Sequence, residues 1–514
     1  MHVGAGILGS RLVGLVRQRA LAHYLGLSFA ADAFNAAFRI PNFLQNLFGE
    51  GVLSASFIPV YARLLAEGNE EEAGRTAGAV LTLLAVATSV LVLMGMLATP
   101  LLIGVIAPGF VGDKRELTIY LVRLLFPGAG LLVLSAWCLG VLNSHRRFLL
   151  SYSAPIAWNL AIIAALLFTG GAAEPAKLAV AAAAGSVLGS ALQLMVQLPT
   201  VWRLVPRLAL SLGRASSHVR TVVANFVPVF VGRGVVQISA YVDTVIASFL
   251  PGGAVAALAS AQVLYTLPVS LFGMSVSAAE LPAMSSVTGS AEQVAEVLRA
   301  RLGRGLRRIS FLVVPSAVAF VVLGDVVAAA LFQTGRFTHA DSLYVWGILA
   351  GSAVGLLAST LGRLYSSAFY ALRDTRTPLR YAIVRVVLTT GLGVFFAIPL
   401  PHLLGIETRW GAAGLTASAG IAGWVEFALL RRGLGSRVGP TPIGTGYLAR
   451  LWLAAGVAAA AGWGIKLALG AMHPIEVAAF TLVPYGALYF ALTAAMGVGE
   501  SRATLARVFR RGAP

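Results

Sequence analysis

The sequence predicts an all-α, polytopic membrane protein with about fourteen transmembrane helices, and three observations support this fold class. Of the 514 residues, 58% are hydrophobic and 11% are charged, whereas an average soluble domain has about 25% charged residues. The mean hydropathy is +0.84. The apolar residues form long runs, and about 20 suffice for a helix to cross the hydrocarbon core. This composition excludes a soluble enzyme, a disordered chain and a nucleic-acid-binding domain, despite a net charge of +18.

Short links with turn residues, such as Pro251-Gly252-Gly253, separate the apolar runs. No link is long enough to hold a soluble domain. The expected segments are Val3 to Gly26, Asp32 to Leu64, Gly74 to Ile106, Leu117 to Leu142, Ser151 to Gly170, Leu178 to Trp202, Val219 to Phe249, Ala254 to Met284, Leu306 to Phe332, Ser342 to Leu372, Pro378 to Ile398, Trp410 to Leu430, Tyr447 to Leu469 and Pro474 to Gly497.

Basic residues are distributed unequally between alternate links. If the N-terminus is cytoplasmic, the inner links and the tail contain most of the arginines. The positive-inside rule then places both termini in the cytoplasm, which requires an even number of spans. The outer links hold only Lys114, Arg115, Lys177, Arg336 and Arg409.

A weak internal repeat predicts two similar lobes. The second segment contains Pro41, Phe48-Gly49 and Pro59, and the eighth contains Pro268, Phe272-Gly273 and Pro282. An offset of six spans preserves orientation, so the lobes would be related by a pseudo-two-fold axis along the membrane normal, with a cavity between them. We expect a six-helix lobe over 1–202, a second over 203–440, two extra helices over 441–500 and a basic cytoplasmic tail over 501–514.

Polar residues inside the first two segments require an explanation, because a charge at the bilayer centre costs about 2.5–3.5 kcal/mol even on the insertion scale. In the first segment Ser10 and Arg17 share one helical face with Gly14, and Arg11 lies on the adjacent face. The second segment carries a polar stripe about 80° wide at ~100° per residue. Its members are Asp32, Asn35, Arg39, Asn42, Asn46 and Glu50.

The seventh and eighth segments are polar in a similar way. Their polar residues are Arg233, Gln237, Tyr241, Thr244 and Ser248, then Gln262, Thr266, Ser277 and Glu280. Hydrogen bonding between helices is the simpler account of residues such as Asn35, Asn46, Thr244 and Ser248. Asp243 suits a structural and a functional role equally well.

The arginines are harder to explain as structural residues. Buried pairs would need carboxylates, and these segments offer mainly Asp32, Glu50, Asp243 and Glu280. The surplus of arginine predicts that an anion completes the charge balance, and guanidinium groups match phosphate and diphosphate oxygens. No metal site is expected, because Cys138 is the only cysteine and Glu70 to Glu72 fit a solvated helix start.

Several motifs, in order along the chain, resemble the lipid II flippase family (MurJ, also called MviN) of the multidrug and oligosaccharidyl-lipid exporter superfamily. The most specific is the run ADAFNAAFRIPNFLQNLFGEGVLSASFIPVYA from Ala31 to Ala62. The others are Ser10-Arg11-Leu12-Val13-Gly14 with Arg17, APGF at Ala107, GVLNSHRRF at Gly140, QISAYVDTVIASFLP at Gln237, LFQTGRFT at Leu331 and AFYALRDTRTP at Ala368.

The resemblance implies a bacterial inner-membrane transporter, not an enzyme. It would move the undecaprenyl-diphosphate-linked peptidoglycan precursor to the periplasmic leaflet by alternating access, for cell-wall synthesis. The implied substrate-binding residues are Ser10, Arg11, Arg17 and Asn42, with Arg39 and Arg233 as supplementary cations. Asp32 and Glu50 would pair with arginines when the cavity is empty or closed, and Asp243 and Glu280 are further charge-pairing or gating candidates.

The expected partners are the polyprenyl-diphosphate glycolipid and membrane lipids, with no nucleic acid. A monomer is expected, and association with cell-wall synthesis proteins stays open. No cofactor is implied, and either Na⁺ or H⁺ is compatible as a coupling ion.

The chain departs from the family pattern at Gln45 and at Gln262-Val263, where charged residues are usual. Four alternatives therefore remain: an exporter of another polyprenyl-diphosphate glycan, a drug-cation exporter, a polyprenyl-phosphate-dependent glycosyltransferase and a transport-dead cell-wall scaffold. The arginine surplus disfavours a drug-cation cavity, and the link from Gly26 to Ala31 is too short for a glycosyltransferase's catalytic loop.

Overall fold

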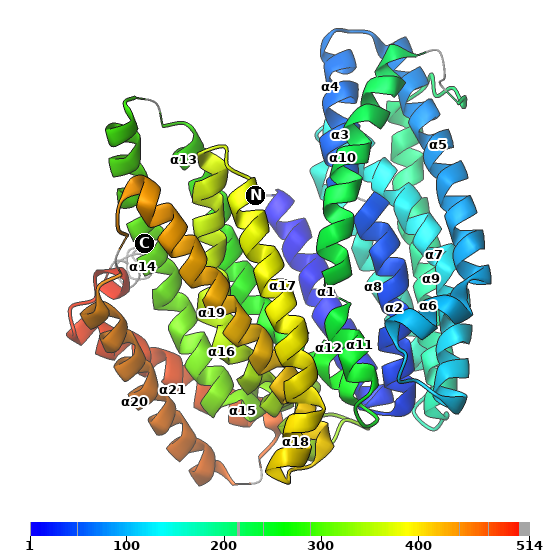
Figure 1. Cartoon of the computed structure of the whole chain (residues 1–514). Coiled ribbons are helices and arrows are strands. Elements are labelled where there is room, and N and C mark those ends of the chain that lie inside the picture. Colours follow the sequence, from blue (N-terminus) through cyan, green and yellow to red (C-terminus); the bar gives the residue numbers. More distant parts are fainter. Residues whose placement is uncertain are drawn as a thin grey trace, which may run out of the picture. The chain divides into compact units, whose positions relative to one another are not determined.

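The computed structural model describes residues 2–48, 50–212, 216–239, 241–287, 289–441, 443–470 and 472–502, and in these ranges the regular elements are helices (Figure 1). The side chains of 2–8, 41, 50, 51, 229 and 231–240 are outside the description. The chain divides into two compact units: unit 1 is Met1–Ala256 with Thr334–Phe337, and unit 2 is Ala257–Gln333 with Thr338–Pro514. The expected boundary after residue 202 therefore differs from this division, in which unit 1 also contains the seventh segment.

Unit 1 contains eleven helices within its described residues. They are α1 (His2–Leu25), α2 (Phe29–Phe48), α3 (Glu50–Ser56), α4 (Ile58–Ala66), α5 (Glu70–Leu97), α6 (Thr99–Ile106), α7 (Gly112–Ser144), α8 (Phe148–Thr169), α9 (Pro175–Leu204), α10 (Ser217–Ser239) and α11 (Val242–Ser248).

Unit 2 begins within α12 and contains the remaining helices. They are α12 (Ala254–Pro268), the π-helix η1 (Val269–Met274), α13 (Ser275–Ser285), α14 (Ala291–Val322), α15 (Gly324–Phe332), α16 (His339–Ala371), α17 (Arg376–Ala397), α18 (Pro399–Leu404), the 3₁₀ helix η2 (Thr408–Trp410), α19 (Gly411–Val438), α20 (Thr445–Leu469) and α21 (Pro474–Ala495).

Eleven described helical stretches are long and apolar enough to cross a membrane. The three predicted segments missing from this set are the first, second and seventh, which form α1, α2 to α4, and α10 with α11. All three contain intramembrane polar residues, and so does the eighth segment, which is nevertheless apolar enough to be in the set. The same polar residues that mark them as candidate functional helices also lower their hydropathy.

Four predicted spans, the second, third, seventh and ninth, are divided into separate helices in the structure. The segment from Asp32 to Leu64 was expected to be one helix, and this prediction is wrong, because a turn at Phe57 separates α3 from α4. Pro59 lies in the first turn of α4, where its missing N–H costs nothing. The third segment divides similarly into α5 and α6, and Pro100 occupies the first turn of α6.

Buried apolar residues of α2 and α7 form much of the core of unit 1. Phe34 and Leu125 belong to one buried cluster, and Phe48 and Trp137 belong to another. One buried polar group in this core is paired across helices, because the indole of Trp137 donates to the carbonyl of Ala77 at 3.1 Å. The result is a rigid platform on which α1, α8 and the polar face of α2 are held.

In unit 2, α16 packs against α14 and α19, and α17 packs against α19 (Figure 1). The two C-terminal helices pack against α14 and α15. Tyrosine hydroxyls of α21 donate hydrogen bonds to backbone carbonyls of α14. Pro315 lies inside α14 and has no N–H to donate to the carbonyl of Phe311. The hydroxyl of Tyr489, on α21, donates to that carbonyl at 2.7 Å. This hydrogen bond replaces the one that Pro315 removes.

The ends of α7 and α16 support the predicted internal repeat. Both helices have 33 residues. Each is followed by an arginine in the left-handed region, Arg146 with φ 58° and Arg373 with φ 59°. Both ends make the same pair of Schellman hydrogen bonds. The long bonds join Arg147 N to Leu142 O and Asp374 N to Phe369 O, and the short bonds join Arg146 N to Asn143 O and Arg373 N to Tyr370 O.

Candidate functional site

The guanidinium group of Arg17 lies between two aromatic rings. Its Cζ is 4.8 Å from the ring centroid of Trp158 on α8 and 5.7 Å from that of Phe38 on α2. The two rings are themselves stacked, with centroids 5.6 Å apart. Cation–π attraction of this kind contributes about 0.5–2 kcal/mol, more when the cation is desolvated. The rings therefore fix the guanidinium plane without neutralising its charge.

Arg17 has no ion-pair partner among the side chains that the structure describes, and its Nε is buried without a hydrogen-bond partner. A buried donor without an acceptor is costly. Arg11, on the adjacent face of α1, is exposed. Two cations on one helix, one of them held by aromatic rings, form a site that an anion would complete.

Arg39, by contrast, is tied into the protein. The charge of Asp243, at the start of α11, acts on Arg39. The hydroxyl of Tyr241 donates to the backbone carbonyl of Arg39 at 2.8 Å, and the Tyr241 ring meets that of Phe43 edge-on at 5.7 Å. The hydrogen bond from Tyr241 thus connects α2 to the start of α11, and the role of Asp243 stays open.

The smaller predicted polar residues divide in the same way. Ser10 and Asn42 are half-buried. Asn35 donates to the carbonyl of Ala31 in its own helix at 2.8 Å. The hydroxyl of Ser248 accepts from the backbone N–H of Gly109 at 3.0 Å. The Ser248 contact joins two segments, as expected of a polar residue between helices, whereas the Asn35 contact stays within α2.

Asp32 lies in a dense network. Only 1% of its side chain is exposed, and Lys114 Nζ at the start of α7 lies 2.5 Å from its Oδ2. The same carboxylate accepts the backbone N–H of Gly253 at 2.7 Å and that of Ala256 at 2.9 Å. The expected partner was an arginine, and the observed partner is a lysine plus the first turn of α12. A carboxylate at a helix N-terminus is stabilised by the exposed amides.

Thr334 to Phe337, from the link after α15, forms a small turn that belongs to unit 1. The Arg336 guanidinium donates to the carbonyls of Gly171 at 3.0 Å and Ala173 at 2.8 Å. Its backbone N–H donates to the carbonyl of His23 at 2.9 Å, and a hydrogen bond of 2.8 Å joins His23 Nδ1 to the Thr334 hydroxyl. This contact set, here called the outer clip, holds the end of α1 and the link between α8 and α9.

The outer clip requires glycine at Gly335. Its φ is +55°, and a Cβ there would lie 2.5 Å from the carbonyl oxygen of His23. A weak signal for this contact is present in the sequence, because Arg336 is one of few cations in the outer links and lies in the LFQTGRFT motif. Sequence periodicity alone does not reveal the partner carbonyls, because they lie more than 160 residues away.

The remaining predicted charges have different outcomes. The side chains of Glu50 and Arg233 lie outside the described residues. Glu280 on α13 pairs with Arg301 on α14, with 3.5 Å between Oε2 and Nη1. In the described part of the chain, no group of three or more His, Cys, Asp or Glu residues has the arrangement of a metal site.

The link between α16 and α17 is a second charged locus. Asp374 accepts from the Thr377 hydroxyl at 2.6 Å, from the backbone N–H of Thr377 at 3.0 Å and from Arg437 at 2.6 Å. Hydrogen bonds from Thr377, reinforced by Arg437, lower the pKa of Asp374 to about 2. The cluster fixes the start of α17 and the end of α19.

The comparisons with known proteins agree with this architecture. The sequence model described as "Lipid II flippase MurJ" matches residues 21–492. A "Probable lipid II flippase MurJ" from Rhizobium meliloti (strain 1021) is 30% identical over 99% of this chain and 96% of its own length. A "Lipid II flippase MurJ" from Burkholderia cenocepacia is 33% identical over 85% of this chain and 83% of its own length.

Two solved structures share the fold. "Lipid II flippase MurJ, inward closed conformation" has a TM-score of 0.76 at 21% identity and covers 96% of this chain and 98% of its own. An inward-facing multidrug transporter of the MATE family has a TM-score of 0.64 at 18% identity, over 82% and 95%. The helical fold, the match along 21–492 and the full-length relatives lead to one conclusion: the chain belongs to the lipid II flippase (MurJ) family.

Proposed function

We propose that this chain moves lipid II, the undecaprenyl-diphosphate-linked peptidoglycan precursor, from the cytoplasmic to the periplasmic leaflet of the bacterial inner membrane. The observation that carries the proposal is the Arg17 guanidinium, which is held against Trp158 and Phe38 without a described counter-ion. A membrane protein keeps an uncompensated cation at such a position when a ligand supplies the negative charge.

The diphosphate is the part of the substrate that Arg17 and Arg11 would bind. Its oxygens accept bidentate hydrogen bonds from guanidinium groups. Ser10 and Asn42 are half-buried, and both lie on the polar helical faces that the sequence predicts. They would add neutral hydrogen-bond donors. Because no described carboxylate pairs with Arg17, binding would not first require an internal ion pair to break.

The task also explains why the polar helices belong to a membrane protein. A sugar-peptide-diphosphate head cannot cross hydrocarbon unaided, so it needs a hydrated path, whereas the polyprenyl tail can stay in the lipid. Alternating access would open that path first to one leaflet and then to the other. Both termini would lie in the cytoplasm, as the arginine distribution indicates. The chain would act as a transporter without a catalytic site.

The test is complementation of a bacterium depleted of its own flippase. Expression of this chain should restore growth and the accumulation of lipid II accessible from outside the cell. Arg11→Ala and Arg17→Ala should abolish both at unchanged protein levels, whereas Arg115→Ala, which changes an outer-link arginine, should not. Full rescue by the Arg17→Ala variant would contradict the binding assignment.

A second candidate is an exporter of another polyprenyl-diphosphate glycan. Gln45 and Gln262-Val263, which stand where charged residues are usual in the family, favour it. It predicts a clear difference in the same cells: growth would not be restored, while another externally accessible diphosphate glycolipid would increase. A transport-dead scaffold would instead be indifferent to Arg17→Ala.

A further inference from the structure

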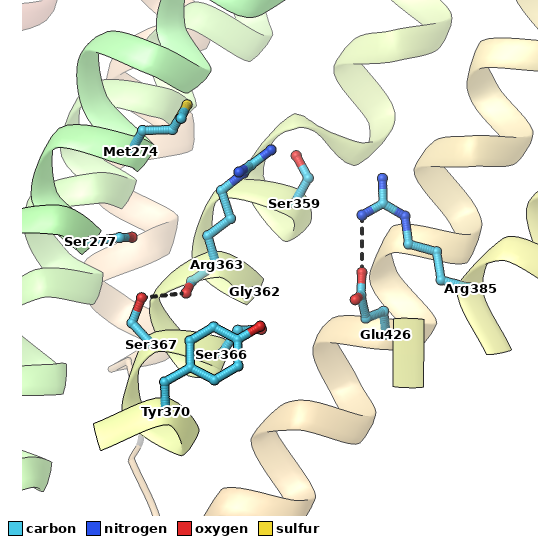
Figure 2. Close-up of a pocket in the computed structure, with 10 residues that line it drawn as sticks. All are labelled: Met274, Ser277, Ser359, Gly362, Arg363, Ser366, Ser367, Tyr370, Arg385 and Glu426. Carbon is cyan, nitrogen blue, oxygen red and sulfur yellow. Dashed lines mark hydrogen bonds and ion pairs between the residues drawn. The ribbon is translucent and has the colours of Figure 1, made fainter. Parts of the chain in front are cut away.

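Unit 2 contains a cavity of about 320 Å³, lined by η1, α13, α16, α17 and α19 (Figure 2). Ligand pockets typically have volumes of roughly 300–1,000 Å³. This cavity is therefore too small for a complete glycolipid head group and large enough for one of its parts. Its lining is mostly polar, with four serines, Tyr370, Arg363, Arg385 and Glu426 among the residues.

Arg363 gives the cavity an unbalanced positive charge. It lies about two turns before the end of α16, and Figure 2 shows its side chain extending along the helix toward Ser359. No carboxylate among the described residues pairs with it. Arg385 and Glu426 form an ion pair with 3.0 Å between Nη1 and Oε2, so they cancel each other. The side chains that line the cavity thus leave a net charge of one.

A second, independent feature is the hydroxyl of Ser277. The residue is 7% exposed, lines the cavity, and its Oγ has no hydrogen-bond partner. A buried hydroxyl without a partner costs about 1–3 kcal/mol. One turn along α13, Glu280 is already paired with Arg301 at 3.5 Å. Ser277 therefore has a free donor directed at the same space as Arg363.

We propose that the Arg363 cavity binds a carboxylate group of the transported head group. The net charge of one matches a carboxylate, which carries a single charge, better than a diphosphate. Arg363 would supply the bidentate guanidinium contact and Ser277 a hydroxyl donor. The inference rests on the proposed function, because the peptide of the precursor supplies the carboxylate. The cavity would then bind the peptide end of the head group, whereas Arg17 would bind the diphosphate.

The experiment measures binding of three small probes to the full chain in lipid nanodiscs by ligand-observed NMR. The probes are N-acetyl-alanyl-alanine, its C-terminal amide and methyl phosphate. The free acid should bind at least about tenfold more tightly than the amide. Arg363→Gln should remove that preference, and Ser277→Ala should weaken acid binding about threefold. Arg380→Gln, which changes an exposed arginine of α17 outside the cavity, is the matched control and should bind like the parent.

The thermal midpoint of each variant establishes whether it is folded, and Arg363→Lys, which keeps the charge, should retain most of the binding if Arg363→Gln unfolds. Equal binding of acid and amide, or acid binding unchanged by Arg363→Gln, would overturn the site. Tighter binding of methyl phosphate would overturn the carboxylate assignment. If the chain binds the acid selectively but does not increase external lipid II, only the proposed function is overturned. If the chain flips lipid II normally but does not bind the acid selectively, only the carboxylate site is overturned.

Discussion

The guanidinium carbon of Arg17 lies 4.8 Å from the ring centroid of Trp158, and this contact joins α1 to α8 at the candidate diphosphate site. An aromatic face attracts a cation without transferring a proton or adding a negative charge. Arg17 is therefore positioned by Trp158 and stays available to an anion. A carboxylate in the same place would also position the arginine, but it would use the hydrogen-bond donors that an anionic ligand needs.

The first prediction concerns this ring. Trp158→Leu removes the face on which Arg17 lies, and we expect substrate affinity to fall about 5–30-fold, the equivalent of a cation–π contribution of about 1–2 kcal/mol. Trp158→Phe should lose less. The measurement is the substrate dependence of flipping in proteoliposomes, with Trp463→Leu, an exposed tryptophan of α20, as the control. Equal affinity in the Leu and Phe variants would argue against a role for the ring.

The second prediction tests the buried pair of Asp32 and Lys114. Asp32→Asn leaves the ammonium group 18% exposed without its counter-charge. Removing one partner of a buried pair costs about 3–5 kcal/mol, so the thermal midpoint in detergent should fall markedly. Lys114→Met in the Asp32→Asn background should recover part of the loss. If the two single changes proved additive in the double variant, the pair would not be coupled.

The third prediction concerns the carbonyl of Phe311, which Pro315 leaves without a helical partner. Tyr489→Phe removes the hydroxyl that donates to it and should reduce stability by about 1–2 kcal/mol. Tyr120→Phe, at an exposed tyrosine of α7, is the control. In a Pro315→Ala background the helix can supply its own N–H, so Tyr489→Phe should cost less there. An equal cost in both backgrounds would contradict the explanation.

The fourth prediction follows from the lowered pKa of Asp374. The folded pKa is about 2 and the ordinary value is 3.8, so the ionised carboxylate stabilises the folded state at pH above about 4. That stabilisation is lost as the pH falls from about 4 toward 2. The difference in thermal midpoint between the parent and Asp374→Asn should be constant above pH 5 and should shrink on acidification. Thr377→Val should reduce it, since Thr377 donates two of the hydrogen bonds.

The sequence by itself determined the membrane class, the helical segments and the polar helices, because hydropathy and the 3.6-residue period are local properties. Arg17 was identified from its face on α1, and Arg363 was not, because a single arginine in an apolar helix gives no periodic signal. Helix ends were harder to predict: the break after Ser56 depends on a few local residues, to which a hydropathy average is insensitive.

Only the tertiary structure decided which charges are already paired. Asp32 and Glu280 look equivalent along the chain, yet one accepts from Lys114 and the start of α12 and the other meets Arg301. Arg17 rests on Trp158, 141 positions away, although the sequence offered it carboxylates nearby. Electrostatic and cation–π energies depend on distances of a few ångströms, and chain folding alone sets those distances between residues far apart in the sequence.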